Sequence, residues 1–233
     1  MQGFSISRLG RAALDLIYPP RCAVCGTSGV FVCEGCIAGL PRADGRRCER
    51  CWLPLRGREC YACAEHPSRL ERLRSAFRYE GGVRHVVHAF KFGGQSSLAP
   101  SLGNLLAEAG ELYGLEADAI VPVPLTASRR RIRGYNQALL MANELSQRTG
   151  VPVAEALRRT GHGATQAGSA SAEERRRNVE GVFSLAKGQS VSGARMLLLD
   201  DVATTGATLD ACAKVILEAG AASVSALTLA RED

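Results

Sequence analysis

The protein has 233 residues, of which 46% are hydrophobic, so the chain is long enough for one ordinary domain and a small accessory one. No segment approaches the roughly 18 uninterrupted apolar residues of a membrane-spanning helix, so we expect no membrane span. Charged residues interrupt the apolar residues near the N-terminus, which argues against a secretory signal and predicts a soluble, cytoplasmic protein.

The formal net charge is +6. Overall basicity is a weak argument for a polyanionic partner, because zinc binding by cysteine thiols displaces their protons and makes the protein less basic. Local clusters are more informative. Residues 67–92 hold six Arg or Lys against two acids, and residues 129–133 hold four Arg and no acid. Such clusters suit phosphate groups, although a solvated surface is an equally good interpretation.

Residues 1–20 predict an N-terminal helix. Apolar residues recur at helical spacing between positions 5 and 17, and Pro19 and Pro20 end the segment. We expect this helix to pack or dock rather than to anchor the protein in a membrane.

The next segment, residues 21–66, contains eight of the nine cysteines as four C-x-x-C pairs. Each such turn directs two thiolates at one centre, and two turns complete a tetrahedral Zn²⁺ shell. Eight ligands therefore predict two structural zinc ions with no open position for catalysis. A disulfide framework would need an oxidising compartment, and a redox role suits four successive copies poorly. The predicted ligands are Cys22, Cys25, Cys33, Cys36, Cys48, Cys51, Cys60 and Cys63.

The spacing leaves two pairings of these turns open. Sequential pairing closes two short hairpins and is our preference, and crossed pairing, first with third and second with fourth, is the alternative. His66 follows the last turn and could replace a ligand, but the eight cysteines suffice. Cys212 stands alone in a helical pattern, which predicts a small buried hydrophobic residue.

Residues 67–233 predict an α/β domain. Alternating strand and helix patterns run through its first half, with strands near 75–79, 118–125 and 151–157 and helices near 83–91, 98–112 and 136–148. Residues 159–177 are rich in Gly, Ser, Ala and Thr without apolar periodicity, which is typical of a mobile functional loop. The C-terminal third then predicts a strand at 196–199, a helix at 207–219 and a strand at 223–230. This βαβ unit implies a parallel sheet with helices on its faces.

The connection after the strand at 196–199 predicts a binding site, because ligands of such sheets sit beyond the carboxyl ends of the strands. The backbone amides of 203–207 can converge on one anion at the start of a helix, and Gly206 allows close approach. Three threonines add hydroxyl donors. Asp200 and Asp201 would repel a phosphate unless they accept hydrogen bonds from the hydroxyls of a sugar that carries it. The residues alone thus favour a ribose 5-phosphate site, and a P-loop is excluded because no Lys follows the Gly.

The stretch LLLDDVATTGATL (197–209) resembles the phosphoribosyl pyrophosphate (PRPP) loop of type I phosphoribosyltransferases. Further segments in the same order are similar to the ComF family of amidophosphoribosyltransferase-like competence proteins. They are LDLIYPPRCAVCG, the four C-x-x-C turns, YEGGVRHVVHAFKFGG, VPVPLTASRRRIRGYNQA and RRNVEGVF. The resemblance covers almost the whole chain and implies a type I phosphoribosyltransferase fold with an N-terminal double zinc ribbon.

The resemblance also implies roles. Asp200 and Asp201 would hold the ribose 2′- and 3′-hydroxyls, and Mg²⁺ would accompany the pyrophosphate. The phosphate-binding residues would be Ala203, Thr204, Thr205, Gly206, Ala207 and Thr208. Candidates for pyrophosphate or other anions are Pro124, Leu125, Thr126, Arg129, Arg133 and Lys91. The loop closing over the ligand would include Arg159, Gln166, Arg175, Arg176 and Asn178.

One departure leaves catalysis open. Purine-salvage members of the type I phosphoribosyltransferases commonly carry an Asp at the position of Thr204. Because Thr cannot act as a general base at neutral pH, transfer to hypoxanthine or guanine is disfavoured. No segment predicts a base-binding hood, so the acceptor is open as well.

The family resemblance implies a protein of natural transformation that assists single-stranded DNA import on the cytoplasmic side, with a competence helicase or other DNA-uptake proteins as partners. A metabolic phosphoribosyltransferase and a non-catalytic nucleic-acid-binding protein are the alternatives. Aromatic residues make up only 5%, so base stacking is expected to be a minor contribution.

Overall fold

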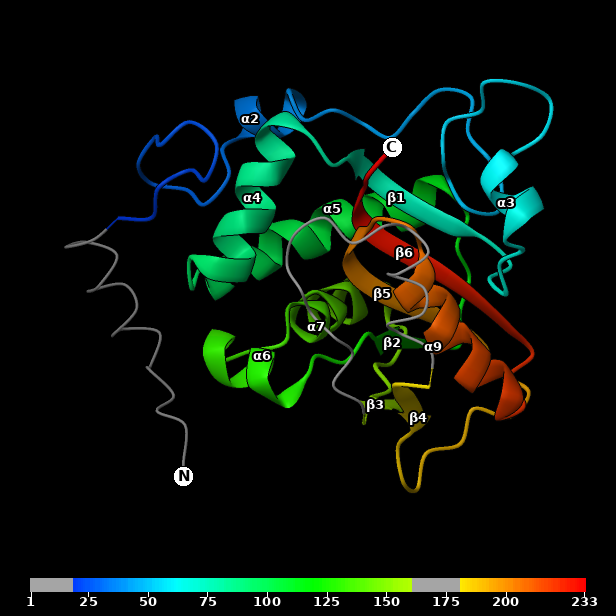
Figure 1. Ribbon diagram of the computed structural model, residues 1–233. Helices are drawn as coiled ribbons and strands as arrows, with labels where there is room; N and C mark the ends of the chain where they lie inside the picture. The colour runs from blue at the N-terminus through cyan, green and yellow to red at the C-terminus, as the bar shows by residue number, and fades with distance from the viewer. Residues whose placement is uncertain (1–18, 161–180) are drawn as a thin grey trace.

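A four-stranded parallel sheet forms the centre of the molecule (Figure 1), in a computed structural model that describes residues 19–160 and 181–233. Its strand order is β1 (Leu73–Arg78), β6 (Ser223–Arg231), β5 (Arg195–Ala203) and β2 (Ala119–Pro122). All three neighbouring pairs are parallel. The parallel α/β sheet predicted from the sequence is therefore confirmed.

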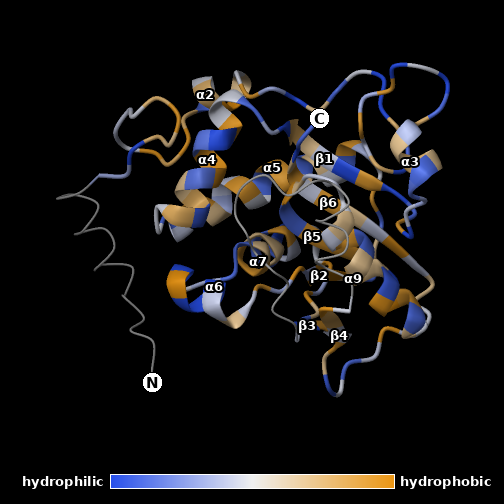
Figure 2. Ribbon diagram, viewed as in Figure 1, coloured by the Kyte–Doolittle hydropathy of each residue, from blue (hydrophilic) through white to orange (hydrophobic). Residues whose placement is uncertain are grey.

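Helices cover both faces of this sheet. Three helices share one apolar cluster with Leu197 and Leu199 of β5, namely α4 (Gly81–Phe92), α5 (Ala99–Leu112, preceded by the short η1, Ser96–Leu98) and α7 (Gln137–Thr149). On the other face α9 (Ala207–Glu218) packs with Met196 and Leu198. Strands buried on both faces are continuously apolar, and the helix ribbons in Figure 2 alternate between hydrophobic and hydrophilic segments because only one side is buried.

The helix over 137–149 begins and ends where the sequence predicted. The Asn136 side chain accepts a hydrogen bond from the Ala138 N–H, and Gly150 ends the helix in the left-handed region. At its crossing with α5, a Cβ added to Gly103 would lie 2.3 Å from the Glu144 Cβ. Glycine at this position therefore allows the two helices to approach closely.

Two strand predictions differ from the structure. The strand expected at 151–157 is wrong: this segment forms a single bridge, Val153 with Ile120, beside β2. Pro152 has no N–H to extend the ladder. The chain then forms β3 (Leu157–Arg159), which pairs antiparallel with β4 (Phe183–Leu185) in a separate two-stranded sheet. In addition, β5 continues to Ala203, so both acids belong to the strand itself.

The cysteine-rich segment lies along β1, the outer strand of the sheet. The Ala43 N–H donates to the Ala76 carbonyl (3.1 Å), and the Arg78 N–H donates to the Pro41 carbonyl (2.8 Å). Trp52 and Ala43 are buried in the same apolar cluster as α9. This segment includes the short helices α2 (Glu34–Ala38) and α3 (Tyr61–Glu65). The two parts of the chain thus share a hydrophobic core.

Within residues 19–160 and 181–233, no helix is long and apolar enough to cross a membrane. The predicted N-terminal helix lies almost entirely outside the described residues.

Candidate functional site

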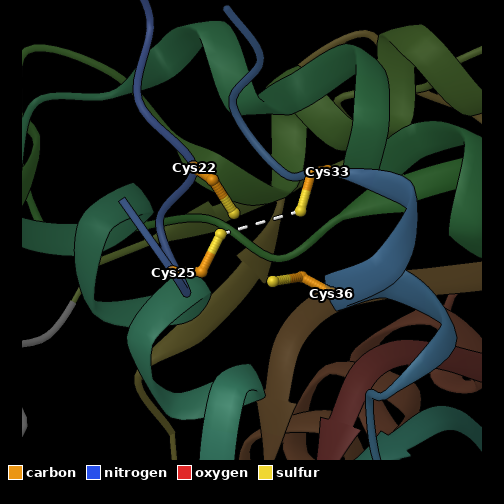
Figure 3. Close-up of side chains that lie close together, drawn as sticks. All are labelled: Cys22, Cys25, Cys33 and Cys36. Atoms are coloured by element: carbon orange, nitrogen blue, oxygen red, sulfur yellow. Dashed lines mark hydrogen bonds between the residues drawn. The ribbon is translucent and has the colours of Figure 1, made fainter. Parts of the chain in front are cut away.

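Two clusters of four cysteine side chains lie in the N-terminal part of the fold. The sulfur atoms of Cys22, Cys25, Cys33 and Cys36 lie within 4.8 Å of one another and point toward a common centre (Figure 3). The same distance limit holds for Cys48, Cys51, Cys60 and Cys63. The sequential pairing of the C-x-x-C turns is therefore confirmed, and His66 belongs to neither cluster.

The spacing of the sulfur atoms fits tetrahedral zinc. Zn–S bonds of about 2.3 Å place the sulfur atoms of such a shell about 3.8 Å apart. Cys25 and Cys33 Sγ are 3.7 Å apart, and Cys48 and Cys63 Sγ are 3.8 Å apart. Burial opposes ionisation of Cys22, but backbone N–H groups directed at its sulfur outweigh burial and lower its pKa to about 6. Cys22 thus offers a preformed thiolate ligand for a structural Zn²⁺ in the first cluster. In the second cluster, backbone N–H groups likewise outweigh burial and lower the pKa of Cys48 to about 7.

The acid pair lies at the carboxyl end of β5, beside helix α4. Lys91 Nζ lies 2.7 Å from Asp201 Oδ1, and their side chains are only 21% and 9% exposed. Lys91 was predicted as an anion contact, and it is placed at the site. In this structure, however, its ammonium group pairs with a carboxylate.

Asp200 has a different environment. Burial, followed by the adjacent Asp201 carboxylate, raises the pKa of Asp200 to about 7. The charges of Lys91 and Arg133 and the Asp201 N–H, which donates to Asp200 Oδ1 at 2.9 Å, limit that rise. An acid with this pKa changes its charge near neutral pH, where a sugar hydroxyl would need it as an acceptor.

Helix α6 (Ala127–Arg133) brings a second cation to the acids. Burial lowers the pKa of Arg133, and the Asp201 carboxylate opposes that shift. Arg133 Nη1 donates to Gln137 Oε1 at 2.8 Å. The Gln137 Nε2 atom is buried and has no hydrogen-bond partner among the described residues, so it is a further donor near the site that the sequence did not indicate.

The predicted pyrophosphate segment is half-buried between β2 and α6. Its threonine, Thr126, caps α6 by accepting from the Arg129 N–H at 3.2 Å. Pro124 and Leu125 lie in the irregular connection before this cap. The Thr126 hydroxyl therefore has a structural role already, and the guanidinium groups are the better anion ligands here.

Arg159 was predicted to lie in a flexible loop, and this is wrong because it ends strand β3. Its guanidinium lies 5.2 Å from the centre of the Phe183 ring on the paired strand. Burial, then repulsion by Arg129, lowers the pKa of Arg159, and its Nε atom has no hydrogen-bond partner among the described residues. Four loop residues lie outside the described part of the chain, namely Gln166, Arg175, Arg176 and Asn178.

The connection between β5 and α9 offers free backbone donors. Gly206 has φ +79°, a conformation that favours glycine, and it precedes the first residue of α9. The Ala207 N–H donates to Thr205 Oγ1 at 3.3 Å. The N–H groups of Thr204, Thr205, Gly206 and Thr208 have no hydrogen-bond partner within the described residues. Donors at a helix N-terminus suit an anion such as a phosphate.

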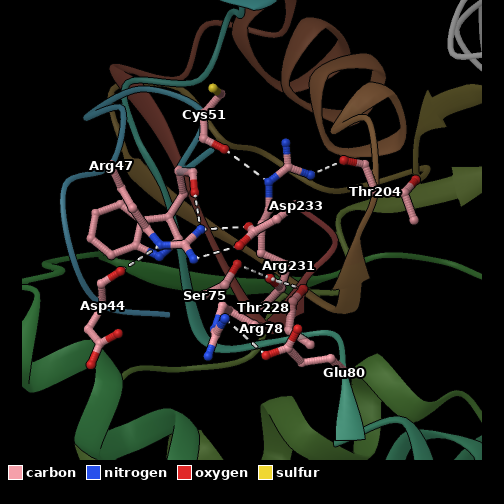
Figure 4. A network of polar contacts seen from close by, with 12 residues as sticks. Asp44, Arg47, Cys51, Ser75, Arg78, Glu80, Thr204, Thr228, Arg231 and Asp233 are labelled. Atoms are coloured by element: carbon pink, nitrogen blue, oxygen red, sulfur yellow. Dashed lines mark hydrogen bonds and ion pairs between the residues drawn. The ribbon is translucent and has the colours of Figure 1, made fainter. Parts of the chain in front are cut away.

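A buried arginine ties this connection to the second cysteine cluster (Figure 4). Arg231 is 1% exposed, and its guanidinium donates to the Thr204 and Cys51 carbonyls. The sequence reasoning missed Arg231, although a charged residue that ends an apolar strand could have indicated it. A cavity of about 540 Å³ lies between the connection and this cluster, and its lining includes Cys63, His66, Arg69, Gly206 and Lys214.

The arginines of the basic segment 67–92 have partners within the fold. Arg69 pairs with Asp210 at 2.6 Å, and Arg74 is buried against Glu49. Arg72 donates to the Gly114 carbonyl, Arg78 pairs with Glu80, and Arg84 lies over the Tyr79 ring. Each of these arginines thus has a partner within the fold, and a contact of this segment with DNA phosphates stays a prediction.

Fold and site together define a protein with a phosphoribosyltransferase-type domain joined to a double zinc ribbon. The chain matches the double zinc ribbon domain family over residues 13–66. It matches the phosphoribosyl transferase domain family over residues 135–233.

Similar proteins identify the family to which the chain belongs. The chain is 34% identical to the DNA utilization protein YhgH of Escherichia coli O157:H7, over 86% of this chain and 90% of that protein. It is 30% identical to the competence protein ComFC of Bacillus subtilis, over 86% of this chain and 84% of that protein. The chain belongs to this family, the ComF family. Among solved structures, it is similar to glutamine PRPP amidotransferase from B. subtilis, with 24% identity, a TM-score of 0.40 and coverage of 57% of this chain and 26% of that chain.

Proposed function

We propose that the β5–α9 site binds PRPP and that the protein serves the uptake or use of DNA in the cytoplasm. The DNA part of this proposal is supported by the names of the relatives given above, a DNA utilization protein and a competence protein. The eight cysteine ligands support the cytoplasmic location, because their thiols must stay reduced to bind zinc.

The observation that carries the PRPP part is the combination of unlike groups at one strand end. Asp200 and Asp201 can accept from ribose hydroxyls, and the unpartnered N–H groups of the following connection can hold the 5-phosphate. Lys91, Arg133 and Arg159 carry positive charge toward the same acids, which suits a ligand that is itself anionic. This donor and acceptor set fits a sugar phosphate with a pyrophosphate group.

Carboxylate oxygens are also the ligands that Mg²⁺ prefers, so Asp200 and Asp201 fit an ion that accompanies the pyrophosphate and neutralises its charge. In this chain Lys91 already neutralises part of the charge of Asp201. The acceptor of a phosphoribosyl group, and hence a transfer reaction, forms no part of the proposal.

Calorimetry with PRPP, with and without Mg²⁺, tests the proposal. Asp200→Asn/Asp201→Asn should weaken binding by on the order of 1.5–3 kcal/mol per lost charge-assisted hydrogen bond. The matched control is Glu116→Gln/Asp118→Asn, which removes two acids that pair with Arg195 at the other end of the sheet. Equal affinity in both double variants, or no PRPP binding by the wild type, would sink the proposal.

A further inference from the structure

Helices α4 and α6 present exposed side chains close to the two cations that face the acid pair, Lys91 and Arg133. Phe92 at the end of α4 is 66% exposed, and Ile132 on α6 is 86% exposed. The His88 ring lies 5.1 Å from the Phe92 ring, and the Arg133 guanidinium lies 5.1 Å from it. The second of these contacts joins the two helices at Phe92. We call the set His88, Phe92, Arg130, Arg131 and Ile132 the α4–α6 surface.

This surface is cationic and its charge is available. Arg130 and Arg131 are exposed, and neither side chain has an ion-pair or hydrogen-bond partner in the part of the chain that the structure describes. The arginines of segment 67–92, by contrast, have partners in the fold. Helix α6 also contains no acid, so the charge of Arg130 and Arg131 is not offset within it. Charge therefore favours a polyanion at this surface.

The exposed Phe92 ring favours one class of polyanion, a nucleic acid with unpaired bases. An aromatic side chain among arginines provides a face on which an unpaired base can stack, while the guanidinium groups contact the phosphates on either side. In a duplex the bases are stacked on one another and offer no free face. The low aromatic content of the sequence predicted that stacking would be minor. The structure instead exposes one of the few aromatic residues, Phe92, beside the Arg133 guanidinium of α6.

We propose that the α4–α6 surface binds single-stranded nucleic acid, with Phe92 stacking on a base and Arg130 and Arg131 on phosphates. This inference rests on the proposed function and assigns its DNA-binding part to named residues. The surface adjoins the proposed PRPP site, because Lys91 and Arg133, which face Asp201, are the sequence neighbours of Phe92 and Ile132.

Fluorescence anisotropy with a labelled single-stranded oligonucleotide, measured over a range of salt concentrations, tests the surface. Arg130→Ala/Arg131→Ala should flatten the slope of log K against log salt by up to about 1.4, because each phosphate contact on a single strand contributes about 0.7. The charge-matched control is Arg56→Ala/Arg58→Ala, which removes two exposed arginines from the cysteine-rich segment and should leave the slope unchanged.

Phe92→Ala should weaken binding roughly 5- to 150-fold, and Phe92→Tyr should restore most of it, because both aromatic rings can stack on a base. Its control is Tyr61→Ala, which removes another exposed aromatic ring (78% exposed) and should have no effect. A duplex of the same length should bind more weakly than the single strand. Equal binding of the duplex would overturn the stacking role of Phe92.

PRPP calorimetry on the same proteins separates the possible failures. If the wild type binds the oligonucleotide and the surface variants match their controls, the surface is wrong and the proposed function stands. If the wild type binds PRPP but no oligonucleotide, the surface and the DNA part of the proposed function both fail. Arg130→Ala/Arg131→Ala should retain the PRPP affinity of the wild type, which also shows that the variant is folded.

Discussion

Lys91 Nζ on α4 lies 2.7 Å from Asp201 Oδ1 at the end of β5, and the pair is mostly shielded from solvent. Each partner therefore compensates a charge that would be costly to bury alone. The ion pair also fixes the end of α4 against the strand that carries the proposed site.

Breaking this pair from one side should destabilise the protein. Lys91→Met leaves the Asp201 carboxylate buried without its ion-pair partner and with only the charge of Arg133 nearby, so we expect a loss of up to about 3–5 kcal/mol in the free energy of unfolding. The double variant Lys91→Met/Asp201→Asn should recover much of that loss, because the uncompensated charge is gone. Urea denaturation of the two single variants and the double variant measures the coupling. Additive effects would show that the pair contributes little.

The raised pKa of Asp200 predicts pH dependence in both stability and binding. A free Asp has a pKa near 3.9, whereas burial and Asp201 raise that of Asp200 to about 7. Between these values the folded state binds more protons than the unfolded state, so the free energy of unfolding should fall as the pH rises from about 4 to about 7.

Binding should follow the opposite trend. Ribose hydroxyls need the ionised carboxylate as acceptor, so PRPP affinity should increase as the pH rises through 7. Calorimetry at pH 6 and pH 8 measures this increase. Asp200→Asn retains the titration of PRPP itself and lacks that of the carboxyl group. An equal increase in this variant would therefore assign the effect to the ligand.

Arg231 should matter to the proposed phosphate site, because it supports the connection between β5 and α9 from within the fold. Arg231→Met removes the donors to the Thr204 and Cys51 carbonyls, and each buried acceptor left unpaired costs about 1–3 kcal/mol. We expect lower stability and weaker PRPP binding, since Thr204 loses its support. Arg195→Met, which removes an exposed arginine in surface ion pairs, is the control and should leave PRPP binding unchanged.

The two cysteine clusters should bind two zinc ions per chain, with unequal consequences for the site. Cys22→Ser and Cys48→Ser should each leave one zinc ion in protein prepared without chelator, as measured by metal analysis. Because the second cluster contacts Arg231 through the Cys51 carbonyl, Cys48→Ser should weaken PRPP binding more than Cys22→Ser does. Fewer than two zinc ions in the wild type would contradict the assignment.

The sequence predicted a structural feature correctly where a short local pattern was enough to determine it. The spacing of the cysteines predicted two zinc sites, and Asn136 with Gly150 marked the two ends of a helix. The acids at 200 and 201 were predicted just beyond a strand; they lie within its last residues, near the carboxyl end where ligand sites of parallel sheets occur.

Contacts between residues that are far apart in the sequence could not be predicted. Arg69, Arg74 and Arg78 pair with Asp210, Glu49 and Glu80, and only the last of these acids is close to its partner in sequence. The roles of Gln137 and Arg231 likewise depend on burial, which a single sequence does not reveal for an isolated polar residue. Strand prediction at 151–157 failed for a related reason: its composition suited a strand, but the sheet offered it one bridge only.

The backbone contacts of residues 41–43 with β1 give the cysteine-rich segment a protective role. An edge strand with unpaired N–H and C=O groups is a template for pairing with another chain, and β1 would be such an edge without this cover. The cover is held in place between the two cysteine clusters. Loss of zinc would therefore expose the unpaired edge of β1 and favour self-association. The metal would thus protect the protein from aggregation in addition to stabilising the local fold.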